Sequence, residues 1–202
     1  MPESLKKLIR SINMLPWIGE KSATKLAFFL LNANKNFIED FSKNLIDLKE
    51  NTGKCSTCHA ITDKWKEICV ICSNTSRQKN NICIVEEYLD MLTIEQTGNY
   101  SGVYHILWGA VSPINGVFVW DLNFTSLFQR IKDSEANLEL ILATNPNIEW
   151  EATTSYLKEE ITKRGLKHKT TLTRLSRWLS SGYIEYADNM TLINALKERK
   201  EI

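Results

Sequence analysis

The stretch ICIVEEYLDMLTIEQTGNYSGVYHILWG, residues 82–109, determines the fold of the larger part of this sequence. Its two ends, ICIVEE and GVYHILWG, are short apolar runs bounded by polar or turn residues, which is the pattern of buried strands. The segment between them, LDMLTIEQTG, has the pattern of a helix. A strand, a helix and a second strand in this order predict an α/β unit with a mainly parallel sheet.

The same alternation continues toward the C-terminus. LELILATN, residues 138–145, is a third apolar run of strand length. FTSLFQRIKDS and EATTSYLKEEITKRG, residues 124–134 and 151–165, are helical patterns. The α/β region is therefore expected to extend to a short tail that contains TLINALKERK, residues 191–200.

The first fifty residues have a pattern typical of helices. A first apolar stripe at helical spacing ends at the segment MLPWIGE, residues 14–20, whose proline and glycine mark a turn. Two further helices are expected after this turn, and the second of them ends near Gly53. The apolar positions of the three helices are Leu5, Leu8, Ile9 and Ile12; Ala23, Leu26, Ala27, Phe29 and Leu30; and Ile38, Phe41, Leu45 and Leu48. Two helices joined by a tight apolar-Pro-x-apolar-Gly turn predict a helix–hairpin–helix.

Four of the five cysteines form two C-x2-C pairs, CSTC and CVIC, separated by ten residues. Disulfides are one interpretation, but a cytosolic chain without a secretory leader argues against them. Two such pairs on a short hairpin supply the four thiolates that tetrahedral zinc binds at about 2.3 Å. We therefore expect one structural Zn²⁺ per chain, with no open coordination position for catalysis. Its ligands would be Cys55, Cys58, Cys69 and Cys72.

Two further residues near this pattern have simple interpretations. His59 follows Cys58 directly and is either a spare ligand or a bystander, and we favour the bystander. Cys83 lies alone in an apolar run and is expected to be a small buried hydrophobe.

Composition limits the classes of function. The chain has 202 residues, of which 43% are hydrophobic and 24% charged, as in ordinary globular proteins. A net charge of +1 creates no global field toward nucleic acid or membrane, so any anion-binding surface must be local. No apolar run reaches the roughly 18 residues of a membrane span, and no secretory apolar segment begins the sequence. These features predict a cytoplasmic protein.

Lys21 and Lys25 are candidate DNA-binding residues in the stretch LPWIGEKSATKLAFFLL, residues 15–31. They are four residues apart, so they lie on one helical face and repel each other slightly. The start of the helix offers free backbone N–H groups to an anion, and a phosphate between the lysines would turn repulsion into attraction. Such contacts position a protein without reading sequence, so binding is expected to be non-specific and salt-sensitive. The alternative is a solvated helix face.

The sequence resembles the bacterial recombination mediator family RecR over nearly its whole length. The matching segments include residues 15–31, the four cysteines, ICSNTSRQ, ICIVEE, TIEQTGNYSGVYHILWG, SPINGV, ILATNP, EATTSYL and IEYADNMTL. The resemblance implies a helix–hairpin–helix over residues 1–53, a C4 zinc finger over 54–76, a Toprim domain over 80–175 and a C-terminal arm over 176–202. The arm would help to close a ring of subunits.

The resemblance also implies a function. Such proteins are DNA-binding clamps of recombinational repair that act with RecO, and in some settings RecF, to load recombinase onto single-stranded DNA. Their DNA-contacting basic residues map onto Lys21 and Lys25, in agreement with the pattern described above.

A catalytic role is not expected. Toprim enzymes combine a glutamate after the first strand with an Asp-x-Asp motif after a later one, and these carboxylates hold Mg²⁺. Glu86 has the first position, but LATNP offers Thr144, Asn145 and Pro146 at the second, which are poor ligands for a hard cation. A Toprim-type Mg²⁺-dependent nuclease or primase-like enzyme is the alternative function.

Acidic residues near the first predicted strand suggest a protein interface. Glu86, Glu87 and Asp90 would form an acidic surface that, by the resemblance, receives a basic protein partner. A solvated acidic loop is an equally good interpretation. Glu149 and Glu151 lie at a helix start, where their negative charges interact favourably with the helix dipole.

Several positions depart from the RecR pattern by carrying large residues in place of glycine or proline. Where glycine serves a left-handed backbone, a Cβ costs on the order of 1 kcal/mol or more; where it allows close approach of DNA or a subunit, bulk blocks the way. Tolerated drift is one interpretation. The other gives Trp17 a stacking role on an unpaired base, worth ~1–3 kcal/mol. The departures are Trp17, Phe118, Val119, Trp150, Trp178, Ser180 and Tyr183.

Overall fold

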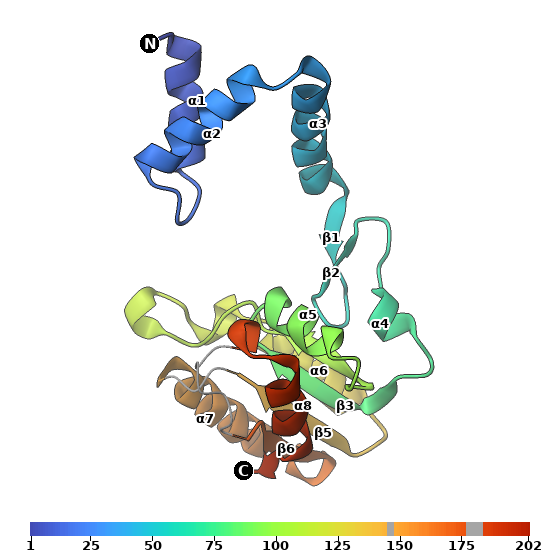
Figure 1. The fold of residues 1–202 in the computed structure, drawn as a ribbon. Helices are drawn as coiled ribbons and strands as arrows, with labels where there is room; N and C mark the ends of the chain where they lie inside the picture. The colour runs from blue at the N-terminus through green and yellow to red at the C-terminus, as the bar shows by residue number, and fades with distance from the viewer. Residues whose placement is uncertain (145–147, 177–183) are drawn as a thin grey trace. The chain divides into compact units, whose positions relative to one another are not determined.

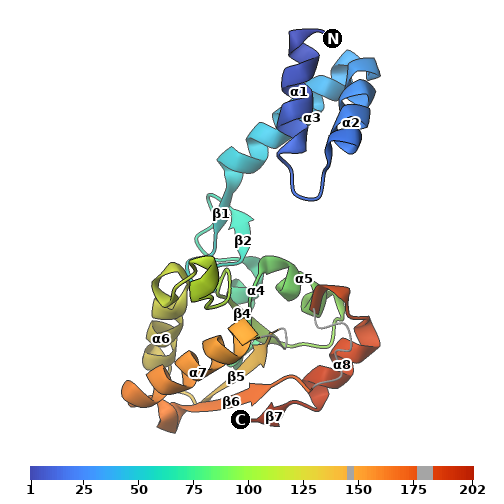
Figure 2. The same ribbon diagram turned by 90° about the vertical axis from the view of Figure 1, so that its left-hand side faces the viewer.

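The computed structural model describes residues 1–144, 148–176 and 184–202 (Figures 1 and 2). These residues divide into two compact units, Met1–Thr52 and Gly53–Ile202. Each unit has its own hydrophobic core. In the described ranges, no helix is long and apolar enough to cross a membrane.

The N-terminal unit consists of three helices, as the sequence predicts: α1 (Glu3–Asn13), α2 (Glu20–Asn32) and α3 (Lys35–Asn51). α1 and α2 pack against each other through a small core formed by Leu5, Ile12, Ala23 and Ala27. The Asn34 side chain caps α3 by accepting a hydrogen bond from the Phe37 N–H at 2.8 Å.

The apolar stripe of α3 is not covered by its own unit. Phe41, Leu45 and Leu48 all lie among the exposed large hydrophobic residues, and no residue of α3 is buried. The stripe is continuous at helical spacing, so it is an unpartnered apolar face within the N-terminal unit.

The second unit begins with a small hairpin that carries the cysteines. Strands β1 (Thr52–Lys54) and β2 (Ile61–Asp63) pair with each other, and the short helix α4 (Val70–Ser73) follows. The first C-x2-C pair directly follows β1, and the second pair spans the start of α4.

A five-stranded sheet in the order β4-β3-β5-β6-β7 forms the centre of the second unit. Neighbouring strands are parallel except for the last pair, β6 and β7. The three strands expected from the sequence are present, whereas β6 and β7 are additions that the sequence patterns did not predict. The strands are β3 (Gln78–Val85), β4 (Gly102–Ile106), β5 (Leu138–Ala143), β6 (Thr170–Arg174) and β7 (Lys200–Glu201).

Helices cover both faces of the sheet, which explains its near-continuous apolar strands. Figure 2 shows α6 and α7 on one side and α5 and α8 on the other. Alternate residues of β3 reach opposite cores: Cys83 and Val85 pack with α5 and α8, and Ile82 and Ile84 with α6 and α7. The helices are α5 (Tyr88–Gln96), α6 (Phe124–Asp133), α7 (Ile148–Lys163) and α8 (Asn189–Lys197), with 3₁₀ turns η1 (Pro113–Asn115), η2 (Val119–Asp121), η3 (Lys167–Lys169) and η4 (Ile184–Tyr186).

The described C-terminal residues 184–202 pack onto the same unit. α8 contributes Leu192 to the core, and β7 pairs with β6. Arg199 donates to both carboxylate oxygens of Glu139, at 2.5 and 2.8 Å, and Thr173 donates to the same carboxylate at 2.9 Å. This polar group anchors the end of the chain to β5 and β6.

Candidate functional site

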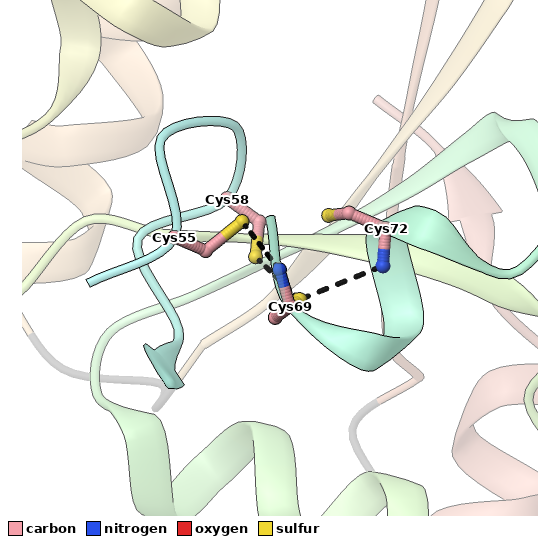
Figure 3. A group of neighbouring side chains, drawn as sticks. All are labelled: Cys55, Cys58, Cys69 and Cys72. Carbon is pink, nitrogen blue, oxygen red and sulfur yellow. Dashed lines mark hydrogen bonds between the residues drawn. The ribbon is translucent and has the colours of Figure 1, made fainter. Parts of the chain in front are cut away.

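The four predicted ligand cysteines converge on one point (Figure 3). Their Sγ atoms all lie within 4.8 Å of one another, and the Cys58 and Cys69 sulfurs are 3.5 Å apart. A tetrahedral metal with bonds of about 2.3 Å would separate its sulfur ligands by about 3.8 Å, so the cluster has the dimensions of such a site. Elsewhere in the described ranges, no other group of three or more Cys, His, Asp or Glu has this convergence.

Backbone N–H groups orient the sulfur atoms. The Cys69 N–H donates to Cys55 Sγ at 3.3 Å, and the Cys72 N–H donates to Cys69 Sγ at 3.5 Å as the cap of α4. N–H donors around sulfur stabilise thiolates, the form that binds a metal. The donor set therefore fits a four-thiolate metal ion.

His59 does not join the cysteine cluster, so the bystander interpretation is confirmed. Its Nε2 lies 2.7 Å from Ser126 Oγ on α6, and its ring packs edge-to-face on His105 with 5.3 Å between centroids. Its carbonyl accepts from the Trp108 indole at 2.9 Å, while the Ile106 N–H donates to the Cys58 carbonyl at 2.9 Å. These contacts fasten the cysteine hairpin to the end of β4.

His105 is a buried neutral histidine of the core. Burial lowers its pKa to about 3, and its Nε2 lies 2.9 Å from the carbonyl of Asn123. Cys83 is also fully buried, as expected, and burial raises the pKa of its thiol. Neither residue is exposed for chemistry.

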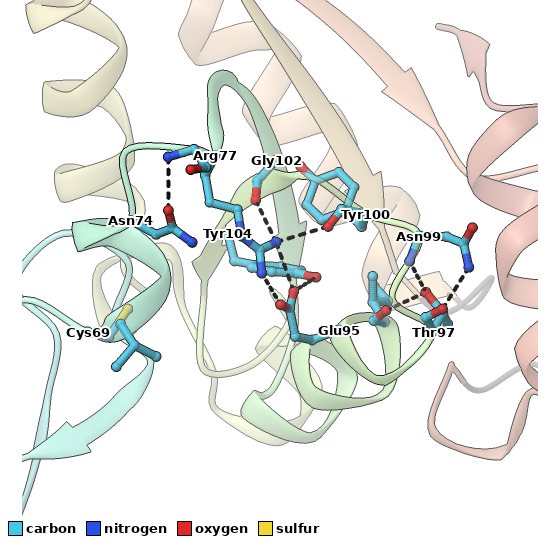
Figure 4. Close-up of polar contacts among 12 residues, drawn as sticks. Cys69, Asn74, Arg77, Glu95, Thr97, Asn99, Tyr100, Gly102 and Tyr104 are labelled. Atoms are coloured by element: carbon cyan, nitrogen blue, oxygen red, sulfur yellow. Dashed lines mark hydrogen bonds and ion pairs between the residues drawn. The ribbon is translucent and has the colours of Figure 1, made fainter.

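A polar network that the sequence patterns did not identify connects the segment between α4 and β3 to α5 and β4 (Figure 4). Arg77 forms an ion pair with Glu95, and its Nη1 donates to the Tyr100 carbonyl at 2.9 Å. Tyr104 donates to Glu95 at 2.8 Å. The Glu95 carboxylate raises the pKa of the Arg77 guanidinium. A Cβ on Gly102 would lie 2.3 Å from the Tyr100 hydroxyl, which explains the glycine there.

The acidic residues after β3 have three different environments. Glu86 accepts a hydrogen bond from the Trp150 indole, whereas Glu87 is exposed. Asp90 is only 6% exposed and accepts from the Glu87 N–H at 2.9 Å in a capping box. Burial raises the pKa of Asp90 to about 6. The expected acidic surface therefore excludes Asp90, whose carboxylate caps α5 instead.

The described residues around Glu86 do not form a divalent-cation site of the Toprim type. Thr144 is buried, and its hydroxyl finds no partner among described residues. Asn145 and Pro146 lie outside the described ranges. Glu149 and Glu151 lie in the first turn of α7, as predicted, and Glu151 pairs with Arg174 at 2.6 Å. The carboxylates that a hard cation requires are thus separated or already paired.

Lys21 and Lys25 are both exposed on α2, in its first and second turns. Gly19 provides no side-chain cap, so the N–H groups at the start of α2 have no side-chain acceptor there. Neither lysine forms an ion pair within the described part of the chain. Lys25 also borders a groove of about 690 Å³ lined by Phe28, Phe29 and Phe37.

The large residues at the expected glycine positions differ in backbone conformation and in burial. Trp17 has a φ of 59°, in the left-handed region, and its side chain is fully exposed. Trp150 is helical and 0% exposed, so no backbone strain applies there. Phe118 stacks on Trp120 with 4.7 Å between ring centroids. Trp178, Ser180 and Tyr183 lie outside the described residues.

Comparison with protein families agrees with this architecture. Residues 80–176 match the model of the Toprim domain, which defines the class of the α/β unit. Residues 5–49 match the model described as RecR, helix-hairpin-helix. A RecR helix–hairpin–helix followed by a Toprim domain is the RecR domain combination, and this chain has it.

Proposed function

We propose that this protein is a non-catalytic DNA-binding clamp of recombinational DNA repair. It acts in the cytoplasm with RecO, and in some settings RecF, to load recombinase onto single-stranded DNA. The RecR domain combination supports a role in recombination. The observation that carries the DNA-binding part is the pair of exposed, unpaired lysines beside the uncapped start of α2.

In this proposal Lys21 and Lys25 hold a DNA phosphate together with the N–H groups of α2. Phosphate at a helix N-terminus is stabilised by both the free N–H groups and the helix dipole. The cations give no base readout, so the affinity is the same for any sequence and falls with salt.

Replacing both lysines by glutamate tests this site. We expect sharply weaker binding to any DNA and a salt slope lower by about 0.7–0.9 for each lost phosphate contact. The control is Lys43→Glu with Lys49→Glu, which makes the same charge change at exposed positions of α3. Unchanged affinity and salt slope in the Lys21/Lys25 variant would refute the phosphate site and leave the solvated-face interpretation.

The four cysteines hold one structural zinc in the proposed protein. The ion would cross-link the segment after β1 to α4 through four thiolates, leaving no coordination position for a substrate. The same hairpin is fastened to β4 through Cys58 and His59, so the metal also stabilises the connection to the Toprim sheet.

The clamp is proposed to be a ring of identical subunits. The uncovered stripe of α3, with Phe41, Leu45 and Leu48, supports association because a continuous exposed apolar face of this kind is usually covered by a partner. Mass measurement in solution, with and without DNA, checks this part. A monomer under both conditions would contradict it.

The alternative function, a Mg²⁺-dependent nuclease or primase-like enzyme, needs a carboxylate cluster that the described residues do not supply. Glu87, together with Glu86, is instead proposed to contact a basic protein partner. A DNA-cleavage assay with Mg²⁺ separates the two functions: cleavage that disappears in Glu86→Ala would establish the enzyme.

A further inference from the structure

The loop between β4 and α6 carries two aromatic rings on its surface. Phe118 stacks on Trp120, with 4.7 Å between the ring centroids and an interplanar angle of 11°. The Trp120 side chain is 75% exposed, and Ile114 in the same loop is 99% exposed. Phe118 is one of the residues that depart from the RecR pattern, so the stacked pair is a feature of this chain and not of the pattern.

The backbone of the loop holds the aromatic pair in place. Ser112 and Val117 exchange two N–H···O=C hydrogen bonds of 3.0 Å, which close a turn. The Phe118 N–H donates to Asp121 Oδ2 at 2.9 Å. Val117 and Val119 pack against the core on the side of the sheet covered by α6 and α7. The exposed rings are therefore anchored from beneath, and a surface ordered in advance loses little conformational entropy when it binds.

The loop adjoins the backbone that carries the acidic residues after β3. The Gly109 N–H donates to the Glu86 carbonyl at 3.2 Å, and a Cβ on Gly109 would lie 3.9 Å from the Val117 side chain. Glu87, the next residue along the chain, is exposed. Residues 110–129 contain no lysine or arginine, and Asp121 is their one charged residue. The loop and the strand end beside it thus present apolar surface together with negative charge.

We propose that Phe118 and Trp120 form the apolar part of the surface that receives the basic protein partner. The partner segment carries an aliphatic or aromatic side chain that lies on the Trp120 ring, and a lysine or arginine that faces Glu87. Concentrated exposed apolar surface marks interaction sites, and tryptophan is enriched among the residues that dominate binding energy. Unpaired bases also stack on exposed indoles, but such sites combine the ring with cations, which this loop does not contain.

This inference rests on the protein partner of the proposed function and deepens it by adding an apolar anchor to the charge contact. Binding of purified RecO to the full-length protein, with its cysteine site loaded with zinc, tests it. We expect Trp120→Ala to weaken the complex about tenfold or more at fixed ionic strength, and Trp120→Phe, which keeps an apolar ring, to retain most of the affinity. Glu87→Gln should lower the salt dependence of binding, because it removes a charge contact.

Trp65→Ala is the matched control, because that indole is 71% exposed in the segment after β2 and lies outside the proposed surface. RecO affinity that is unchanged in Trp120→Ala, or lost equally in Trp65→Ala, would overturn the proposal. Weaker binding of Trp120→Ala to a single-stranded oligonucleotide, with RecO affinity unchanged, would assign the ring to base stacking and overturn it as well. A lower mass of this variant in solution, again with RecO affinity unchanged, would assign the loop to contact between subunits with the same consequence.

The failure of this inference is distinguishable from failure of the proposed function. Absence of a RecO complex with the unchanged protein would overturn the proposed partner and the apolar anchor together. A normal RecO complex with Trp120→Ala would overturn the anchor alone, and DNA binding by Lys21 and Lys25 would remain.

Discussion

The turn before α2 and the first turn of α7 each carry a tryptophan where the RecR pattern has glycine, yet the two residues have opposite physical roles. Trp17 has a strained left-handed backbone conformation and a fully exposed side chain, so the ring adds no packing to the core of its own unit. Trp150 has a relaxed helical backbone, a fully buried ring and a hydrogen bond to Glu86. Identical substitutions in sequence can therefore strain one region and build the core of another.

The contrast between the two units is expected to be largest when the metal site is removed. Cys55→Ser or Cys72→Ser should lose the metal and most soluble protein, because binding free energy at such a site is largely folding free energy. The N-terminal unit has a separate core that includes none of the four cysteines. Elemental analysis together with circular dichroism checks this prediction. Metal-free protein that remains fully folded would contradict it.

Removal of the Trp150 ring is the next largest expected effect. Trp150→Ala should lower the free energy of unfolding by about 3–5 kcal/mol, because it empties a buried site and leaves the Glu86 carboxylate without its indole donor. Urea unfolding measures the change. Trp120→Ala is the control, since that ring is exposed and should change stability far less. Equal effects of the two substitutions would contradict the assignment of Trp150 to the core.

Asp90 gives a pH-dependent test of the same region. Its pKa is raised to about 6 from an ordinary value of 3.8, so the native state binds the proton more tightly than the unfolded state. Its contribution to stability is complete below about pH 4 and is lost as the pH rises through 6. The Asp90→Asn variant has no carboxyl group to titrate at this position, so its free energy of unfolding does not contain this pH-dependent loss. Between pH 4 and pH 6 the variant should therefore gain on the order of 2 kcal/mol of stability relative to the unchanged protein. Parallel stability profiles between pH 4 and 6 would contradict the shift.

Trp17→Gly should produce the smallest effect and the opposite sign. Glycine removes the left-handed strain and costs no packing, so the N-terminal unit should gain about 1 kcal/mol of stability. Thermal unfolding of the full chain, followed in the helical unit, measures the gain. DNA binding separates the two interpretations of the residue: stacking predicts weaker single-strand binding in the variant, whereas drift predicts equal or better binding.

Local sequence patterns were sufficient to predict most helices and strands, because the apolar periodicity of each such segment is visible within the segment itself. The apolar runs at residues 82–87, 102–109 and 138–145 correspond to β3, β4 and β5, and the helical patterns correspond to α1, α2, α3, α5, α6 and α7. The tail that contains TLINALKERK forms α8, a helix that the sequence patterns did not predict. β6 was missed because TTLTR has no apolar run, and its strand conformation comes from pairing with β5. β7 is only two residues long and exists through its pairing with β6.

The sequence alone determined the class of the fold and the clustering of the four cysteines, since periodicity and spacing encode these directly. Only the tertiary structure decided that Asp90 is a buried cap, that His59 faces α6, and that Trp150 reaches Glu86 across 64 positions of the chain. Contacts of this kind depend on which segments the sheet brings together. No local pattern records a partner so distant in the sequence, and burial then sets the energy of the contact.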